Sequence, residues 1–551
     1  MIHLNVEPMK ARPFVLMALM LLAPVGVAAS ENPTPPSVNS VVEPNPGESA
    51  HIDPSAFSDV PIPPGRVEAA VAQLDAMAEA ALATTGVPGM AIAVVHRDRA
   101  VYLKGFGRRS LDGEAPVDAE TVFQLASLSK PIAATVVAAA VDRARVEGRD
   151  DVRAAVAWDD PIVRHLPDFA LSDAAITPRV TIADLFAHRS GLPDHVGDLL
   201  EDIGYGRAEI LSRLRFYPLA PFRTSYAYTN FGLTAAAEAV ARAAGMPWED
   251  LSQDLLYGPL GMTSTSSRFE EFVAAPNHAI GHIRRDGVWM VTPEVRQPDA
   301  QSPAGGVSSS ATDMAQWMRL VLGEGTLDGK PVIGSEALAR IHSPNLMSSP
   351  LHGPSSRPNF YGLGFGVSVD SSGRVRWSHS GAFLLGAATT LAMLPSESLG
   401  ILILTNGQPV GAPEGIAASF LELVETGEIR NDWPALYGGA MAGLYTWHTA
   451  FGEVPTAPAP ARPLDAYVGR YANDLYGTAV VEATEAGLVL RLGPSPTALS
   501  LSHFDGDAFT FRPIGEDALG SSGAVFAFEG DRAASLQIEF LDEEGLGTFK
   551  R

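Results

Sequence analysis

A serine and a lysine three residues apart are the most informative pair of reactive residues in the sequence. Ser127 and Lys130 stand in the segment FQLASLSKP, directly before the run IAATVVAAAVDRARVEG. Pro131 suits a first helical turn, and the Ala/Val-rich run that ends near Gly148 predicts a buried helix. Residues i and i+3 share a helix face, so the Lys130 amine is expected to reach the Ser127 hydroxyl and activate it as a nucleophile.

This pair alone is weak evidence, because a serine and a lysine fall three apart by chance in most chains. In the simplest alternative, Ser127 caps the helix and Lys130 is a solvated residue of its first turn. Against that alternative, a lysine in a long Ala-rich helix is expected to be largely buried, and a buried lysine without a role is costly. Both residues are therefore candidates for nucleophilic catalysis.

A second motif stands at the entry to another Ala-rich segment. Tyr228 and Asn230 lie in RTSYAYTNFGLTAAAEAVARAAG. In an extended segment, residues two apart point the same way, so the phenol and the amide can face one site. In the alternative interpretation Tyr228 packs in the core and Asn230 caps the helix that follows.

A third motif, His379-Ser380-Gly381-Ala382, leads toward a predicted strand. A strand that carries this sequence can line a cleft, because the glycine lets a substrate backbone approach closely.

Taken in this order, S-x-x-K, Y-x-N and [KH]-[ST]-G resemble the serine β-lactamase and penicillin-binding-protein superfamily. The chain is most similar to the class C β-lactamase-related branch, which also contains DD-peptidases, D-aminopeptidases and esterases. The resemblance covers the chain from about Arg66 to Glu428 and includes the segments GVPGMAIAVV, LFAHRSGLP, SPAGGVSSSATDMAQWM and YGLGFGV.

The resemblance implies a role for each candidate residue. Ser127 is the acylated nucleophile and Lys130 its general-base partner. Tyr228, its phenol acidified by the neighbouring ammonium, shares the proton and later activates the deacylating water. Family members differ in which of the lysine and the tyrosine takes the proton, and the pair titrates as a coupled unit in either case. Asn230 binds a substrate amide oxygen and holds Lys130 in place. The backbone N–H groups of Ser127 and Ala382 form the oxyanion hole.

One position departs from the β-lactamases of this branch. They usually carry Lys where this chain has His379, and a partly protonated imidazole is the remaining way to bind a β-lactam carboxylate. Ser380, Gly381 and Ala382 are expected to bind substrate beside it. The sequence therefore favours a peptidase, amidase or esterase over a β-lactamase or DD-carboxypeptidase. A penicillin-binding or cell-wall sensor protein without turnover is the non-enzymatic alternative.

The composition excludes several other classes of protein. The 551 residues include 39 Lys+Arg and 63 Asp+Glu, which gives a net charge of −24, and no Cys. Disulfides, cysteine nucleophiles and Cys-ligated metals are therefore impossible, and the acidic balance argues against nucleic-acid binding. Nucleotide-binding motifs and G-x-S-x-G are missing, and His278 and His282 lack the H-E-x-x-H pattern. We expect a small-molecule or peptide substrate, no metal and no cofactor.

The first 65 residues are expected to stand apart from the fold. Lys10 and Arg12 precede the apolar run PFVLMALMLLAPVGV and the small residues Val27-Ala28-Ala29, so residues 1–29 are predicted to be a secretory signal peptide. An uncleaved anchor is the alternative, but the run is shorter than the ~20 residues that span a bilayer. The mature protein is expected to be secreted or periplasmic, without a stable membrane span. Residues 30–65 read as a Pro-rich tether.

Residues 66–430 have the pattern of an α+β domain. Two hairpins are predicted far apart in the sequence, and the segments between them are mostly helical. The simplest closed arrangement places both hairpins in one antiparallel sheet with the helices packed on it. The predicted hairpin strands are Gly89–Val95, Ala100–Phe106, Ala387–Leu394 and Gly400–Leu404.

The C-terminal part has a different pattern. Residues 431–463 are expected to be a linker that ends in TAPAPARP. From residue 464 to 551, short alternating runs separated by turn signals predict a small all-β accessory domain, a barrel or a sandwich.

Overall fold

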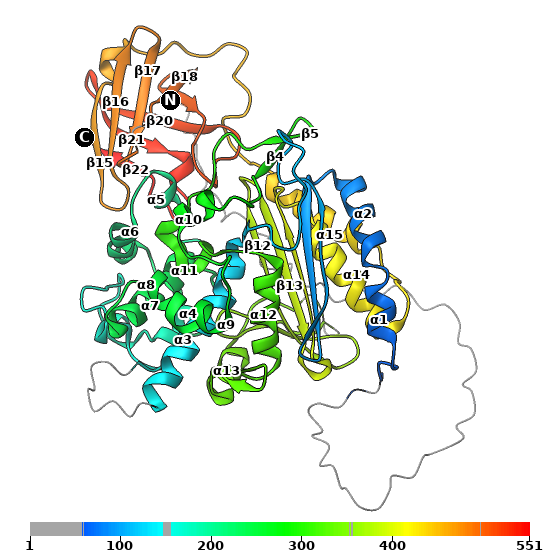
Figure 1. Cartoon of the computed structure of the whole chain (residues 1–551). Helices are drawn as coiled ribbons and strands as arrows, with labels where there is room; N and C mark the ends of the chain where they lie inside the picture. The colour runs from blue at the N-terminus through cyan, green and yellow to red at the C-terminus, as the bar shows by residue number, and fades with distance from the viewer. Residues whose placement is uncertain (1–57, 59, 147–155, 352, 354–355, 496) are drawn as a thin grey trace, which may run out of the picture.

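The structure is a computed structural model that describes residues 58, 60–146, 156–351, 353, 356–495 and 497–551. The expected signal peptide and the tether up to residue 57 lie outside the described residues. The chain folds into a sheet covered by helices on both faces and a separate β-barrel at one corner (Figure 1). Within the described ranges no helix is both long and apolar enough to cross a membrane.

The central sheet is antiparallel and has eight strands in the order β2-β1-β14-β13-β12-β11-β10-β9. It joins the two predicted hairpins edge to edge, because β1 pairs with β14 and sets Met90 opposite Thr405. This arrangement confirms the α+β prediction. The strands are β1 (Gly89–His96), β2 (Arg99–Gly107), β9 (Leu346–Met347), β10 (Phe360–Tyr361), β11 (Gly366–Val369), β12 (Val375–Phe383), β13 (Ala387–Leu394) and β14 (Leu399–Thr405).

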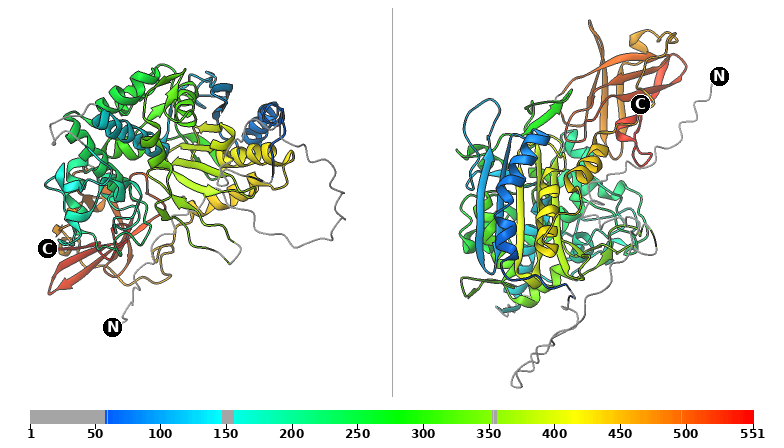
Figure 2. Two further views of the ribbon diagram at one scale, coloured as in Figure 1. Left: turned by 90° about the horizontal axis from the view of Figure 1, so that it is seen from below. Right: turned by 90° about the vertical axis from the view of Figure 1, so that its right-hand side faces the viewer.

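Both faces of the sheet are buried, and β1 shows how the sequence achieves this. Met90, Ile92 and Val94 pack on one side, whereas the alternate residues between them pack on the other. The first side is covered by α1 (Arg66–Val71), α2 (Leu74–Thr85) and α14 (Ala412–Thr426), which lie across the strands in the right-hand view of Figure 2. A break at residues 72–73 separates α1 from α2, and α2 ends at the cap residue Gly86.

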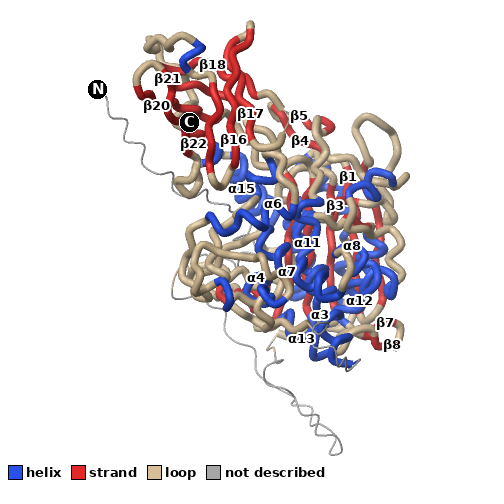
Figure 3. The backbone as a smooth tube through the Cα atoms, turned by 90° about the vertical axis from the view of Figure 1, so that its left-hand side faces the viewer, coloured by secondary structure: helices blue, strands red, loops and turns tan. Residues whose placement is uncertain are grey.

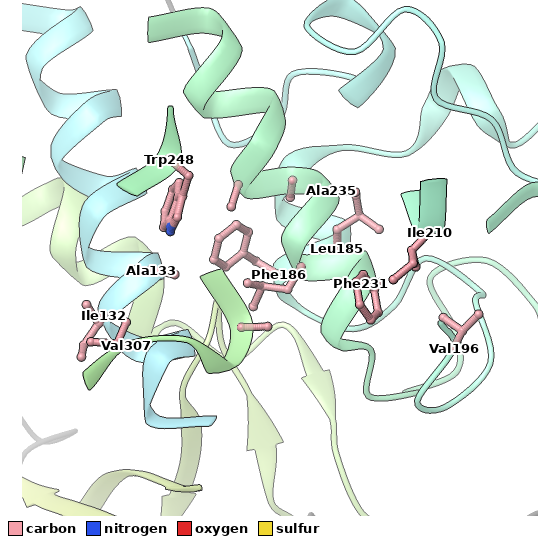
Figure 4. Packing of buried hydrophobic residues seen from close by; sticks show 14 of the residues in the cluster. Ile132, Ala133, Leu185, Phe186, Val196, Ile210, Phe231, Ala235, Trp248 and Val307 are labelled. Carbon is pink, nitrogen blue, oxygen red and sulfur yellow. The ribbon is translucent and has the colours of Figure 1, made fainter. Parts of the chain in front are cut away.

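The opposite face carries the larger helical layer, and α3 (Ser129–Val146) runs through it. Small Ala side chains let the helices approach closely, and aromatic rings such as Phe186 and Phe231 fill the space between them (Figure 4). The other helices of this layer are α4 (Ile182–Phe186), α5 (Asp198–Asp202), α6 (Arg207–Arg213), α7 (Asn230–Ala244), α8 (Trp248–Ser252), α9 (Gly258–Leu260), α10 (Phe269–Ala274), α11 (Ser302–Gly305), α12 (Ala311–Leu322) and α13 (Ser335–His342).

Three short strand pairs complete the part of the chain that forms the central sheet and its helices. The pair β3–β6 matters for the site, because it sets Phe123 opposite Ser309 and brings the segment around α11 beside the start of α3. The pairs are β3 (Phe123–Gln124) with β6 (Ser308–Ser309), β4 (His282–Arg285) with β5 (Val288–Val291), and β7 (Thr326–Leu327) with β8 (Lys330–Pro331).

The C-terminal region is a closed eight-stranded barrel, so the prediction of a small all-β domain is confirmed. Alternate residues of its strands point inward, as Leu488, Leu490 and Leu492 do. Figure 3 shows its strands apart from the helix-covered sheet. The strands are β15 (Gly469–Asn473), β16 (Gly477–Thr484), β17 (Gly487–Leu492), β18 (Leu499–Asp505), β19 (Ala508–Phe511), β20 (Ser522–Glu529), β21 (Arg532–Ile538) and β22 (Thr548–Lys550).

The segment expected to be a linker, residues 431–463, begins with a helix. The helix α15 (Trp433–Ala442) packs Trp433 and Tyr437 against Ala418 of α14. The aromatic side chains supply the buried surface that a linker lacks. After this helix and the short turn Gly443–Tyr445, the chain continues toward the barrel.

The barrel rests on the helical layer through α5 and α6. Arg213 donates hydrogen bonds to the carbonyl oxygens of Asp474 (3.0 Å) and Leu475 (2.7 Å). The Tyr205 hydroxyl donates to the carbonyl of Tyr476 at 3.1 Å.

Candidate active site

Ser127 lies in a single 3₁₀ turn, Ala126–Leu128, immediately before α3. Ala126 and Leu128 are buried, whereas Ser127 is partly exposed. Ala126 has φ of 48°, a left-handed conformation that costs energy for a residue with a Cβ. The turn is fixed by β6, since the Leu125 N–H donates to the Val307 carbonyl at 2.9 Å. The fold thus presents this one hydroxyl from an otherwise buried turn.

Lys130 is completely buried one helical turn further on. Its Nζ lies 3.1 Å from the Ser127 Oγ, 2.7 Å from the Asn230 Oδ1 and 2.9 Å from the Ala304 carbonyl oxygen. Burial lowers the pKa of Lys130 to about 7, although the Asp198 carboxylate opposes the shift. A sizeable fraction of Lys130 is therefore uncharged near neutral pH.

The three partners decide what an uncharged Lys130 can do. The Asn230 Oδ1 and the Ala304 carbonyl can only accept hydrogen bonds, so they take the two N–H groups of the neutral amine. The lone pair of Nζ is then left for the third neighbour, the Ser127 hydroxyl. This arrangement can accept the serine proton.

Tyr228 approaches the same hydroxyl from the other side. Its OH donates to the Ser127 Oγ at 2.8 Å, and the Lys130 Nζ lies 4.4 Å from the centre of its ring. Burial raises the pKa of Tyr228 well above its usual range. The phenol is therefore not acidified as expected, because burial outweighs the hydrogen bond to Ser127 that would lower its pKa. Tyr228 is a hydrogen-bond donor here, and Lys130 is the better base.

Asn230 links Lys130 to a carboxylate that the sequence had not singled out. It is the first residue of α7, whose N-cap is Thr229, so Asn230 is not the capping residue. Its Nδ2 donates to the Asp198 Oδ2 at 2.8 Å, which fixes Oδ1 toward Lys130. The same carboxylate oxygen lies 2.8 Å from the His195 Nδ1. Burial alone would lower the pKa of His195, but the Asp194 and Asp198 carboxylates raise it to about 9.

The strand β12 passes close to Ser127 at Gly381. A Cβ on this residue would lie 2.4 Å from the Leu125 carbonyl oxygen and 2.8 Å from the Ser127 backbone nitrogen. The Thr389 hydroxyl on the neighbouring strand also donates to that carbonyl, at 2.8 Å. Ala382, the next residue, is partly exposed. The strand and the amide of Ser127 are thus in direct contact.

Gly381→Ala is expected to lower kcat by about 10²-fold while the protein stays folded, because the methyl group pushes β12 away from the Ser127 amide. Turnover of an ester substrate measures the effect. Gly439→Ala is the matched control, since nothing lies within 4 Å of the Cβ it would add. Wild-type turnover in the Gly381 variant would contradict this account of the contact.

His379 is buried and fully engaged in hydrogen bonds. Its Nδ1 lies 2.7 Å from the Ser380 carbonyl, which can only accept, so Nδ1 carries the proton and Nε2 accepts from the Tyr361 hydroxyl at 2.9 Å. Burial, and then the nearby Lys130, lower the pKa of His379 to about 3. The expectation of a partly protonated imidazole is therefore wrong, and the ring is neutral.

Ser380 is not turned toward Ser127. Its hydroxyl contacts the Thr390 hydroxyl, which in turn lies 3.5 Å from the Glu414 carboxylate on α14. Adjacent side chains of a strand point to opposite faces, and this one points to the face that α14 covers. The placement differs from the substrate contact expected for the Ser380 side chain.

Three further histidines form hydrogen bonds with the backbone. The His188 Nδ1 accepts the Thr229 N–H at 3.1 Å, behind the ring of Tyr228. His282 accepts the Leu111 N–H at 3.0 Å, and His278 lies 2.5 Å from the Ala275 carbonyl. Among the residues the structure describes, no group of three or more His, Asp or Glu side chains is arranged to hold a metal ion.

Three partners of the candidate residues were missed from the sequence. They are Asp198, which orients Asn230, the carbonyl of Ala304, which accepts from Lys130, and Tyr361, which donates to His379. Ala304 and Tyr361 stand in the segments SPAGG and YGLGFGV that carry the resemblance, so these segments were the available signal. Asp198 follows LFAHRSGLP by a few residues and had no signal of its own.

Comparisons with known proteins match most of the chain. A family model described as beta-lactamase matches residues 74–424, and one described as a domain of unknown function (DUF3471) matches residues 454–548. The chain is 27% identical to the unguisins hydrolase ungD of Aspergillus violaceofuscus, over 77% of this chain and 80% of that protein. It is 28% identical to penicillin-binding protein 4 of Amycolatopsis lactamdurans, over 69% of this chain and 91% of that protein.

A solved structure shares the fold over most of the chain. The octameric penicillin-binding protein homologue from Pyrococcus abyssi superposes with a TM-score of 0.55 at 19% identity, covering 85% of this chain and 98% of that one.

Proposed function

Because the chain belongs to the β-lactamase family, we propose that it is an exported serine acyl-hydrolase that forms an acyl-enzyme at Ser127. Its substrates are amide or ester bonds of small molecules or short peptides, so that it acts as a peptidase, amidase or esterase. The observation that carries the proposal is the buried Lys130 amine, 3.1 Å from the Ser127 hydroxyl, with its pKa lowered by burial to about 7.

In the acylation step, the Ser127 Oγ attacks the substrate carbonyl carbon while its proton passes to the Lys130 Nζ. The electron pair of the C=O bond moves to oxygen, where the backbone N–H groups of Ser127 and Ala382 stabilise the charge. The proton then reaches the leaving nitrogen or oxygen through the Tyr228 hydroxyl, and the bond from carbon to that atom breaks. Ser127 is left as an ester of the acyl group.

In the deacylation step, a water molecule adds to the acyl carbon and its proton passes through Tyr228 to Lys130. The bond between carbon and the Ser127 Oγ then breaks, Oγ regains the proton, and the acid is released. Lys130 and Tyr228 both touch Oγ, so their protons move as a coupled pair. Asn230 holds the amine in register through its Oδ1, and its Nδ2 is held in turn by Asp198.

The preference for amides and esters over β-lactams rests on His379. A β-lactam carries a carboxylate that a fixed positive charge helps to hold. The imidazole is buried, and its two nitrogens are engaged by Tyr361 and the Ser380 carbonyl, so it offers no such charge. The names of the two relatives, a hydrolase and a penicillin-binding protein, are compatible with either substrate class.

A substrate panel tests the proposal. We expect kcat/KM for a p-nitrophenyl ester, or for one of a set of D- and L-aminoacyl p-nitroanilides, to exceed that for a chromogenic cephalosporin by at least about tenfold. Faster cephalosporin turnover would make the protein a β-lactamase. Stable acylation of Ser127 with no release of product would make it a penicillin-binding or sensor protein.

Export is supported by the N-terminal sequence alone. The basic residues, the apolar run and the small residues before Ser30 have the order of a secretory signal, and they lie outside the described residues.

A further inference from the structure

A loop of the barrel reaches into the catalytic part of the chain. It joins β19 to β20 and is seated on Asp202 at the end of α5, which lies directly beneath the barrel (Figure 1). The Asp202 carboxylate accepts the backbone N–H groups of Glu516 (2.9 Å) and Asp517 (3.1 Å). Gly515 has φ of 100°, and a Cβ there would lie 2.2 Å from the Asp202 Oδ1. Glycine is thus the residue that lets the loop sit this close.

The loop sends one side chain to the turn that follows β12. The Glu516 Oε1 accepts the N–H of Leu384, in the turn that joins β12 to β13. Its Oε2 lies 3.9 Å from the Arg296 Nε, and Arg296 also forms an ion pair with Glu201. The Arg296 guanidinium stands over the Phe383 ring at 5.4 Å. Glu516 and Arg296 therefore hold the last residue of β12, Phe383, and the first residue of the turn, Leu384.

Of these two residues, Phe383 adjoins the turn that carries Ser127. The Phe383 side chain packs with Ala126 and Ala387 in one small buried cluster. Ala126 directly precedes Ser127, and Phe383 directly follows Ala382. The oxyanion hole is assigned to the backbone N–H groups of Ser127 and Ala382. Each of these residues is next in sequence to one member of the contact between Ala126 and Phe383, which the barrel loop helps to hold.

The contact of Glu516 with Leu384 and Arg296 buries several acidic side chains together. Stability alone does not call for such an arrangement. Glu201, Asp202 and Glu516 are all drawn toward one guanidinium, that of Arg296. Burial raises the pKa of Glu516 to about 8 even though Arg296 and the Leu384 N–H oppose the shift. Apolar residues of similar size fill such an interface at no greater cost in stability.

We propose that Glu516 is a positioning residue for the hydrolysis proposed above: from the barrel, it holds the turn after β12 so that the Ala382 N–H points at the oxyanion. The active site is then complete only when the barrel loop is seated. This inference rests on the proposed function, since it assigns Glu516 to the step in which the oxyanion forms.

The test uses the full chain, a p-nitrophenyl ester and a fluorophosphonate probe. Glu516→Ala removes the acceptor for the Leu384 N–H. We expect kcat and the rate of labelling of Ser127 to fall about tenfold, with KM little changed. This loss is smaller than the ~10²-fold loss of rate that a 1 Å misplacement of a catalytic group can cause. Glu516→Gln keeps an acceptor oxygen and is expected to retain most of the rate. Glu516→Asp shortens the reach and is expected to fall between them.

Arg213→Ala is the control for the interface itself. It removes two hydrogen bonds between α6 and the barrel without touching the turn, so kcat should equal that of the wild type. Equal losses in the Arg213 and Glu516 variants would mean that Glu516 only holds the domains together, which overturns the proposal. Unchanged rates in Glu516→Ala and Glu516→Asp also overturn it. If the wild-type chain neither turns over nor is labelled, the proposed function fails, and this inference fails with it.

Discussion

Ser127→Ala is expected to abolish turnover of every substrate, with a loss in kcat on the order of 10⁴ to 10⁶. The reason is geometric. In the part of the chain that the structure describes, the hydroxyl that both the Lys130 Nζ (3.1 Å) and the Tyr228 OH (2.8 Å) contact is that of Ser127. Steady-state hydrolysis of a p-nitrophenyl ester measures the loss, and intact-mass analysis after fluorophosphonate treatment should show that labelling has disappeared.

Ser343→Ala is a suitable control for that experiment, because Ser343 is exposed and its hydroxyl only bonds the Ala339 carbonyl. The Ser127 variant should fold normally, since its side chain is partly exposed. If Ser127→Ala kept its activity on all substrates, the acyl-enzyme mechanism would be wrong.

Replacing Lys130 is expected to have the second-largest effect. Lys130→Met removes the amine that accepts the Ser127 proton and should lower kcat/KM by about 10³- to 10⁴-fold. Lys130→Arg should be equally inactive, because a guanidinium stays protonated at every accessible pH and cannot act as a base. Lys330→Met, at an exposed lysine far from the site, should behave as the wild type.

The pH dependence gives an independent check on Lys130. The base must be uncharged, and burial lowers its pKa to about 7. The kcat/KM of the wild type should therefore rise as the pH increases through about 7 and level off above it. An acidic limb near pH 4, or a limb near pH 10 that reported an ordinary lysine, would show that another group or an unperturbed amine is the base. Titration of Tyr228 is not expected in this range, because burial raises its pKa.

The motifs were predictable because each depends on short spacings. Ser127 and Lys130 lie one helical turn apart. A long Ala-rich helix is expected to be largely buried, so its lysine is expected in the interior, where Lys130 is found. The two hairpins were equally legible, because alternating apolar runs and polar turns are local signals.

The partners of those residues were not predictable, because they come from distant segments. Asp198 reaches Asn230 only after α5 and α7 have packed, and the Ala304 carbonyl reaches Lys130 only because β3 pairs with β6. The prediction of a partly protonated His379 was wrong for the same reason. Its neutrality follows from burial and from Tyr361, and neither is visible in the tripeptide His-Ser-Gly.

The pairing of β1 with β14 has a consequence for the order in which the protein folds. Met90 can meet Thr405 only after nearly the whole catalytic sequence has left the ribosome, because the partner strand lies at the far end of that sequence. Pairings between such distant segments fold slowly, since chain entropy is lost before the contacts form. The hairpin of β1 and β2 therefore keeps an unpaired edge until β14 has been synthesised. The barrel is built from strands that are neighbours in sequence, so it can close within its own short stretch of chain.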